Sequence, residues 1–150
     1  MIFSPEFEKA RETAISYIGI DHSKSSGRVR QNLLKKGIAP EIADEVIDYY
    51  INLDYINDRR AAKRVALRYK GRRTRAQRMM VSVFIQNGID MKIAKEMAGT
   101  LTDDRDTARI LCESHFPHPS KDDEIAMLKL LARRGYPIGL SRDIVSECLK

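Results

Sequence analysis

The chain contains no tryptophan, few aromatic residues of any kind and only two cysteines. Without aromatic platforms, base stacking is not expected to be the main mode of binding to a nucleic acid. Cys112 and Cys148 are too few for a disulfide framework, and we expect both to be reduced. No apolar run approaches the roughly 20 residues that cross a bilayer, and residues 1–10 lack the features of a signal peptide. We therefore expect a cytoplasmic protein that does not contact a membrane.

Sequence signatures of catalysis are also missing. The chain has no phosphate-binding loop of the form G-x-x-x-x-G-K-[ST], no serine nucleophile elbow and no histidine beside a plausible nucleophile. Two acidic clusters, at 103–106 and 122–124, fall in the first turns of expected helices, where the helix dipole is sufficient reason for them. We expect no enzymatic activity, no catalytic residues, no cofactor and no small-molecule substrate.

Positive charge is concentrated in one stretch, residues 57–78. Residues 1–53 carry seven basic and eight acidic residues, and residues 90–150 carry ten and eleven, so the net charge of +6 is local. Such a block indicates binding to a polyanion or to an acidic protein surface, and the alternative is an ordinary solvated helix face. The ten basic residues, set against the single acid Asp58, are our candidate contact residues: Arg59, Arg60, Lys63, Arg64, Arg68, Lys70, Arg72, Arg73, Arg75 and Arg78.

The stretch from Asn57 to Tyr69 has the period of an amphipathic helix. At about 100° per residue, its small and apolar residues share one side and its basic residues the other. The apolar side holds Ala61, Ala62, Val65, Ala66 and Tyr69. We expect this helix to pack its apolar side inward and to present guanidinium groups, which suit phosphates and carboxylates alike.

A repeat organises the whole chain. Superposing Gly37, Gly88 and Gly135 aligns KKGI, QNGI and RRGY, and the flanking columns are apolar in all three copies. The strongest columns are Leu33, Phe84 and Leu131 before the glycine, and Ile42, Ile93 and Leu140 after it. No strand pattern is present. The sequence predicts an all-α protein of three tandem three-helix repeats, about nine helices, at residues 1–53, 54–101 and 102–150.

Capping residues predict where the helices begin. Ser4 with Pro5 starts the first helix, and Pro40 starts the third. In the last repeat, Asp103 or Thr102 starts the first helix, and the Ser120 to Asp123 stretch has the form of a cap. Gly139 or Ser141 is expected to start the final helix.

The spacing Cys112-x-x-His115-x-x-His118 is the one hint of a metal site. A structural zinc site needs four ligands, and no second pair of cysteine or histidine residues is in register. The repeat places Cys112 in the column of Ala14 and Val65, and Cys148 also falls in an apolar column. We expect both cysteines to be core residues and no metal to bind.

The order and spacing of the motifs resemble the RecX family, bacterial regulators of the RecA recombinase, over almost the whole chain. The segments that carry the resemblance are VRQNLLKKGI, EIADEVIDYY, LDYINDRRAAKRVALRY, FIQNGI and LKLLARRGY. The chain departs from the family at Ala61 and Ala62, where an aromatic residue is common, and its loop KGRRTR is unusually basic.

This resemblance implies a compact or crescent-shaped modular protein, a non-enzymatic regulator that lies along the groove of the RecA filament on DNA. Such a protein would modulate, and in our expectation inhibit, the ATPase, recombinase and coprotease activities of RecA in DNA repair and the SOS response. The implied partners are the RecA filament and the DNA within it, and three self-similar repeats fit a monomer. The alternatives are a direct DNA-binding helical module and a helical-repeat scaffold for an acidic protein partner.

Overall fold

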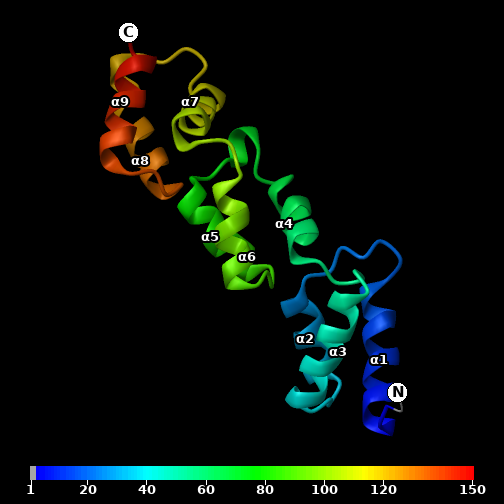
Figure 1. Ribbon diagram of the computed structural model, residues 1–150. Helices are drawn as coiled ribbons and strands as arrows, with labels where there is room; N and C mark the ends of the chain where they lie inside the picture. The colour runs from blue at the N-terminus through cyan, green and yellow to red at the C-terminus, as the bar shows by residue number, and fades with distance from the viewer. Residues whose placement is uncertain (1–2) are drawn as a thin grey trace. The chain divides into compact units, whose positions relative to one another are not determined.

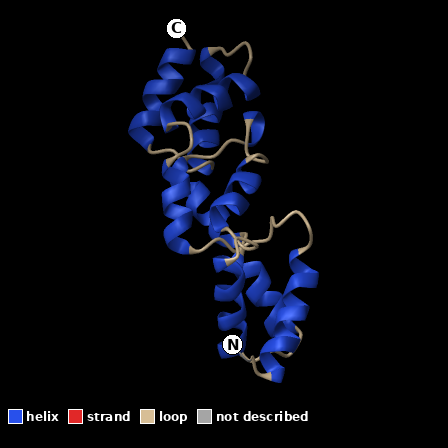
Figure 2. Ribbon diagram, turned by 45° about the vertical axis from the view of Figure 1, so that its right-hand side comes forward, coloured by secondary structure: helices blue, strands red, loops and turns tan. Residues whose placement is uncertain are grey.

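Helices make up all the regular structure of the described chain. The computed structural model describes residues 3–150, which hold nine α-helices and two 3-10 helices and no strand (Figures 1 and 2). The all-α prediction is confirmed, while the first two residues of the predicted first repeat lie outside the described part. The helices are α1 (Pro5–Ile18), α2 (Ser26–Lys35), α3 (Pro40–Asn52), α4 (Asp58–Ala66), η1 (Gly71–Arg73), α5 (Gln77–Gln86), α6 (Met91–Gly99), α7 (Asp104–His115), η2 (Lys121–Asp123), α8 (Glu124–Arg133) and α9 (Ile138–Cys148). Within residues 3–150, no helix combines the length and apolar character needed to span a membrane.

The contacts of the chain group into two compact units. Unit 1 comprises Met1–Arg64 and Phe84–Ala94, and unit 2 comprises Val65–Val83 and Lys95–Lys150. The predicted repeat boundaries at residues 53 and 101 fall in the connections that follow α3 and α6. The division into three repeat domains stays a prediction.

The core of unit 1 is built where α1, α2 and α3 pack on one another. The inward residues of α1 recur at helical spacing, and Ala10, Ala14 and Ile18 are fully buried. Leu33 of α2 and Val46 of α3 are likewise fully buried, so three amphipathic helices share one apolar centre.

The core of unit 2 repeats this arrangement with α7, α8 and α9. Leu111, Leu131 and Ile144 are fully buried, one from each helix. The hydroxyl of Tyr136, also buried, lies 2.7 Å from the hydroxyl of Thr107. Burial raises the pKa of Tyr136 to about 12, so the phenol stays protonated.

Capping explains where most of the helices begin. The side chain of Ser4 accepts a hydrogen bond from the Phe7 N–H at 3.1 Å, and Asp103 accepts one from the Asp106 N–H at 2.9 Å. The predicted cap at Ser120 is a complete capping box.

The predicted start of the final helix is wrong: α9 begins at Ile138, with Pro137 as its N-cap. Ser141 is instead buried within α9, and its hydroxyl donates to the Pro137 carbonyl at 2.8 Å.

Two of the aligned glycines, Gly88 and Gly135, form tight corners against which the start of another helix packs. In unit 1, the Gly27 N–H donates to the Gly88 carbonyl at 2.8 Å, and a Cβ on Gly88 would lie 2.8 Å from Arg28 N. In unit 2, a Cβ on Gly135 would lie 2.9 Å from the Met79 Cβ. Both corner glycines have positive φ, 84° and 93°. Glycine is therefore required twice over, by conformation and by the close approach.

Replacing Gly135 with alanine is expected to lower the free energy of unfolding by about 2 kcal/mol, because the new methyl group adds a steric clash to a left-handed backbone. Gly37 is the matched control, since its φ of 86° is similar but a Cβ added there would have no atom within 4 Å. Gly37→Ala should cost only about 1 kcal/mol. Urea denaturation of both variants measures the difference, and equal costs would show that the close approach is unimportant.

Candidate functional site

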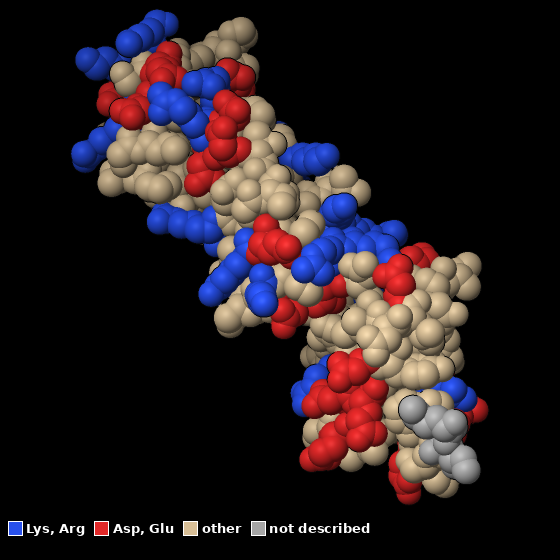
Figure 3. Space-filling view, viewed as in Figure 1, with Lys and Arg blue, Asp and Glu red and all other residues tan. Residues whose placement is uncertain are grey.

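The first candidate basic residues lie on the part of α4 that belongs to unit 1. The side chain of Asn57 accepts a hydrogen bond from the Arg60 N–H at 3.1 Å and so caps the helix. Ala61 and Ala62 are buried, as predicted, while Arg59, Lys63 and Arg64 are exposed. Figure 3 shows lysine and arginine side chains gathered over α4 and acidic side chains over α3. The amphipathic pattern of the sequence thus produces a cationic helix face.

The helix is shorter than predicted. We expected it to reach Tyr69, but α4 ends at Ala66. The N–H groups of Arg68 and Tyr69 bond to the carbonyls of Val65 and Ala66, each at 3.0 Å and three residues back, so the chain tightens into turns there. Arg68 therefore lies in a turn and not on the helix face.

The side chain of Arg60 forms hydrogen bonds that stabilise the fold. Its Nε donates to the His22 carbonyl at 2.8 Å, and its terminal nitrogens donate to the Asp54 carbonyl at 2.9 Å and to the Asp54 carboxylate at 3.3 Å. Hydrogen bonding from Asn57, together with the charge of Arg60, lowers the pKa of Asp54. The guanidinium of Arg60 thus joins the loop after α1 to the loop after α3.

Three arginines of unit 2 are also tied to their surroundings. Arg72 donates to the Ser114 carbonyl at 2.7 Å, and the Nε of Arg78 donates to the Gly135 carbonyl. The guanidinium of Arg75 lies 5.2 Å from the centre of the Tyr69 ring. These contacts orient the side chains and leave other N–H groups of each guanidinium for a ligand.

The remaining candidate residues point outward. Arg59 and Arg68 are exposed, and each interacts with a neighbouring residue. Arg64 lies 3.9 Å from Asp21 in an exposed and therefore weak ion pair. Lys63, Lys70 and Arg73 are exposed, and the described residues provide no carboxylate partner for them. We call Lys63, Arg64, Lys70 and Arg73 the four outward cations.

Arg134 is a residue that the sequence did not single out. Its guanidinium donates to the carbonyls of Arg72 at 2.9 Å and Thr74 at 3.1 Å, so it supports the loop that carries Arg73. Burial, together with the positive charge of Arg75 and Arg133, lowers the pKa of Arg134. A signal existed in the repeat, because Arg134 directly precedes an aligned glycine and the equivalent residues Lys36 and Asn87 are also polar.

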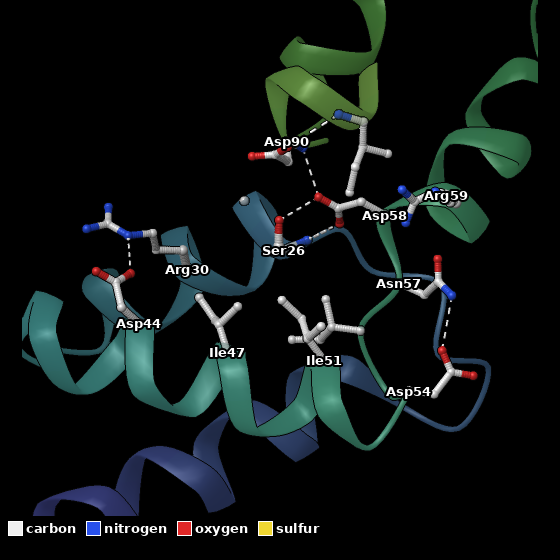
Figure 4. A pocket seen from close by; sticks show the side chains of 13 residues that line it. Ser26, Arg30, Asp44, Ile47, Ile51, Asp54, Asn57, Asp58, Arg59 and Asp90 are labelled. Atoms are coloured by element: carbon white, nitrogen blue, oxygen red, sulfur yellow. Dashed lines mark hydrogen bonds and ion pairs between the residues drawn. The ribbon is translucent and has the colours of Figure 1, made fainter. Parts of the chain in front are cut away.

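Asp58 is the second missed residue, and Figure 4 shows its contacts. Its carboxylate is 6% exposed, and it accepts hydrogen bonds from the Ser26 N–H at 2.7 Å, the Ser26 hydroxyl at 2.6 Å and the Asp90 N–H at 2.8 Å. It therefore joins the starts of α2, α4 and α6 within unit 1. Asp104 has the same role in unit 2, accepting from the Gln77 N–H at 2.8 Å.

Replacing Arg60 with alanine is expected to lower the free energy of unfolding by about 1.5 kcal/mol, because two backbone carbonyls lose a charged donor. The matched variant Arg64→Ala removes the same side chain one helical turn later and should change stability by less than about 0.5 kcal/mol. Thermal unfolding followed by circular dichroism compares them. Similar losses would mean that Arg60 has no special structural role.

The predicted core position of Cys112 is confirmed, since the residue is 1% exposed. Burial raises the pKa of its thiol to about 12, so the group stays protonated. Cys148 is half-buried, and both cysteines are free. His115 Nε2 lies 3.2 Å from the Arg72 carbonyl oxygen, and His118 is exposed. Across residues 3–150, no three His, Cys, Asp or Glu side chains are grouped so that they could hold a metal ion.

Comparison with known proteins identifies relatives in sequence and in fold. No protein-family model matches the chain. The regulatory protein RecX of Corynebacterium efficiens is 30% identical over 120 aligned positions, and the alignment covers 73% of this chain and 57% of that protein. The chain thus spans a little over half the length of that relative. The regulatory protein RecX of Amycolatopsis mediterranei is 25% identical over 155 aligned positions, 96% of this chain and 85% of that protein.

A solved structure supports the fold. The crystal structure of RecX from Lactobacillus salivarius superposes with a TM-score of 0.75 at 19% identity, over 97% of this chain and 98% of that one. Its all-helical fold is the fold described here. Together with the sequence likeness to two RecX regulatory proteins, this likeness in fold supports a RecX family assignment.

Proposed function

We propose that this chain binds the RecA filament on DNA and regulates it without catalysing a reaction. The observation that carries the proposal is the set of four outward cations, Lys63, Arg64, Lys70 and Arg73. Among the described residues, none of them forms a strong ion pair with a carboxylate. The likeness of the chain to RecX regulatory proteins points to RecA as the partner. Exposed like charges that are close in the sequence repel one another, and an anionic partner would relieve that repulsion.

The tied arginines suit the same partner. Arg72 and Arg75 are held by a carbonyl and by a ring, so part of the entropy of ordering them is already lost before a ligand arrives. Guanidinium groups bind phosphate oxygens and carboxylates through paired N–H donors. A protein filament wrapped on DNA offers both acceptors.

A non-enzymatic role fits the use that the chain makes of its buried reactive groups. The carboxylate of Asp58 is occupied by three hydrogen bonds, and the raised pKa of Cys112 keeps its thiol un-ionised. We propose inhibition of the ATPase, recombinase and coprotease activities of RecA, by a cytoplasmic monomer that occupies the filament and so restricts its extension or strand exchange.

Binding to labelled single-stranded DNA, bare or coated with RecA, tests the proposal. Fluorescence anisotropy should show weak binding to bare DNA and much tighter binding to the filament. The rival function, direct DNA binding, predicts tight binding to bare DNA that falls steeply with salt, as counterion release requires. Equal affinity for bare and coated DNA would favour the rival.

A further inference from the structure

Unit 2 contains a pocket that the proposed filament contact does not use in full. It has a volume of about 280 Å³ and lies beside the loop between α4 and α5. Its apolar surface includes Tyr69, Met80, Leu101 and Ile110, which come from two stretches of the chain, 66–80 and 101–110. Ile110 is 45% exposed, so this apolar surface reaches solvent. The pocket could accommodate one aliphatic or aromatic side chain.

The charges on this pocket are of one sign. Among the described residues that line it, only Lys70 and Arg75 are charged, and none is an aspartate or a glutamate. Arg75 is oriented by the Tyr69 ring, 5.2 Å away, while Lys70 is exposed. A ligand that fills the pocket would therefore meet two cations beside an apolar floor.

The pocket of unit 1 shows that this charge is particular to unit 2. That pocket, of about 400 Å³, also has an apolar floor, which includes Ile47 and Ile51 (Figure 4). Four carboxylates line it, among them Asp44, which already pairs with Arg30 at 2.8 Å. Arg30 and Arg59 also line it, so the pocket of unit 1 carries both signs of charge, whereas the charged lining of the unit 2 pocket is cationic.

We propose that the pocket of unit 2 binds an acidic segment of a partner protein, with one apolar side chain inserted and flanking carboxylates paired with Lys70 and Arg75. Charge complementarity and the exposed apolar edge at Ile110 support this occupant. The inference rests on the proposed function in that Lys70 and Arg75 belong to both surfaces. It adds that the partner supplies carboxylates and an apolar side chain here, where DNA would supply phosphates.

The test uses a fluorescein-labelled peptide of glutamate and serine with a single central leucine, titrated with the whole chain in the absence of RecA and DNA. Ile110→Ser should weaken binding about tenfold, since the inserted side chain loses its apolar edge. Ile125→Ser is the matched control, because Ile125 is exposed in the same unit, at 67%, but does not line the pocket. Lys70→Glu should also weaken binding, and Lys129→Glu, in unit 2 away from the pocket, should not.

A second peptide with serine in place of leucine should bind more weakly than the first. Methyl resonances of Ile110 should shift on addition of the leucine peptide, while those of Ile125 should not, which tests the site without any substitution. Equal binding of the two peptides, or an unshifted Ile110, would overturn the inference. Filament binding by the unsubstituted chain is measured in parallel. If that chain binds the filament but does not bind the leucine peptide, only the pocket proposal is overturned.

Discussion

Replacing Asp58 with alanine is expected to lower the free energy of unfolding by about 3 kcal/mol, the largest loss of stability that we predict for a single substitution. The reason is that its buried carboxylate accepts three hydrogen bonds from Ser26 and Asp90, at 2.6 to 2.8 Å. Alanine removes all three acceptor contacts and leaves the donors at the starts of α2 and α6 without this partner. Urea denaturation followed by circular dichroism measures the effect.

Asp104→Ala is the matched control for this substitution. Asp104 is the equivalent first residue of α7, but its carboxylate accepts a single hydrogen bond from the neighbouring helix start, from the Gln77 N–H. Its loss should cost about 1 kcal/mol. Asp58→Asn should fall between the two, since the amide keeps one acceptor oxygen. If Asp58→Ala were no more destabilising than Asp104→Ala, the role assigned to Asp58 would be wrong.

Reversing the charge of the four outward cations is expected to slow association with the RecA filament on the order of a hundredfold at low salt. The variant carries Lys63→Glu, Arg64→Glu, Lys70→Glu and Arg73→Glu. Because these side chains are exposed and make no strong internal contacts, the fold should stay intact. Stopped-flow or surface-based kinetics measures the association rate, and circular dichroism checks the fold.

The control variant makes the same change in net charge by replacing four lysines elsewhere in the chain with glutamate. These are Lys9, Lys36, Lys121 and Lys129, none of which is buried. It should associate with the filament far faster than the first variant, because its substitutions lie outside residues 57–78. Equal slowing by the two variants would show that net charge alone matters, and would remove the candidate site. Arg60 and Arg72 are excluded from the first variant because their bonds to backbone carbonyls hold the fold.

Much of the fold follows from short-range signals in the sequence. The helix starts at Pro5 and Pro40 depend on proline geometry and are correct. The aligned glycines were found from their spacing, and all three have positive φ. What the spacing could not show is why Gly88 and Gly135 also need to be glycine, because the atoms that approach them come from elsewhere in the chain.

The errors occurred where a tertiary contact or the local backbone overrides a pattern. The apolar period through Tyr69 predicted a longer helix, but the turns after Val65 end it at Ala66. Capping preference favoured Gly139 or Ser141 at the start of the last helix, but the buried side chain of Ser141 bonds back to Pro137 within it. Such local hydrogen bonds are not visible in sequence periodicity.

The sequence predicted which basic residues belong to the candidate site, but not which of them stabilise the fold and which are exposed to solvent. Counting charges gave all ten basic residues. It could not separate Arg60, tied to His22 across the chain, from Lys63, which points to solvent. In the sequence, Asp58 was noted only as the single acid among ten basic residues, because its partners Ser26 and Asp90 each lie 32 residues away.

The rate of ATP hydrolysis by RecA on single-stranded DNA, with saturating amounts of this chain, tests the central claim most directly. Binding to the filament should first be verified by co-sedimentation. The account predicts that the chain lowers the rate of hydrolysis, and that the variant with the four outward cations reversed lowers it far less at the same concentration. An unchanged rate of hydrolysis with the wild-type chain bound to the filament would contradict the account.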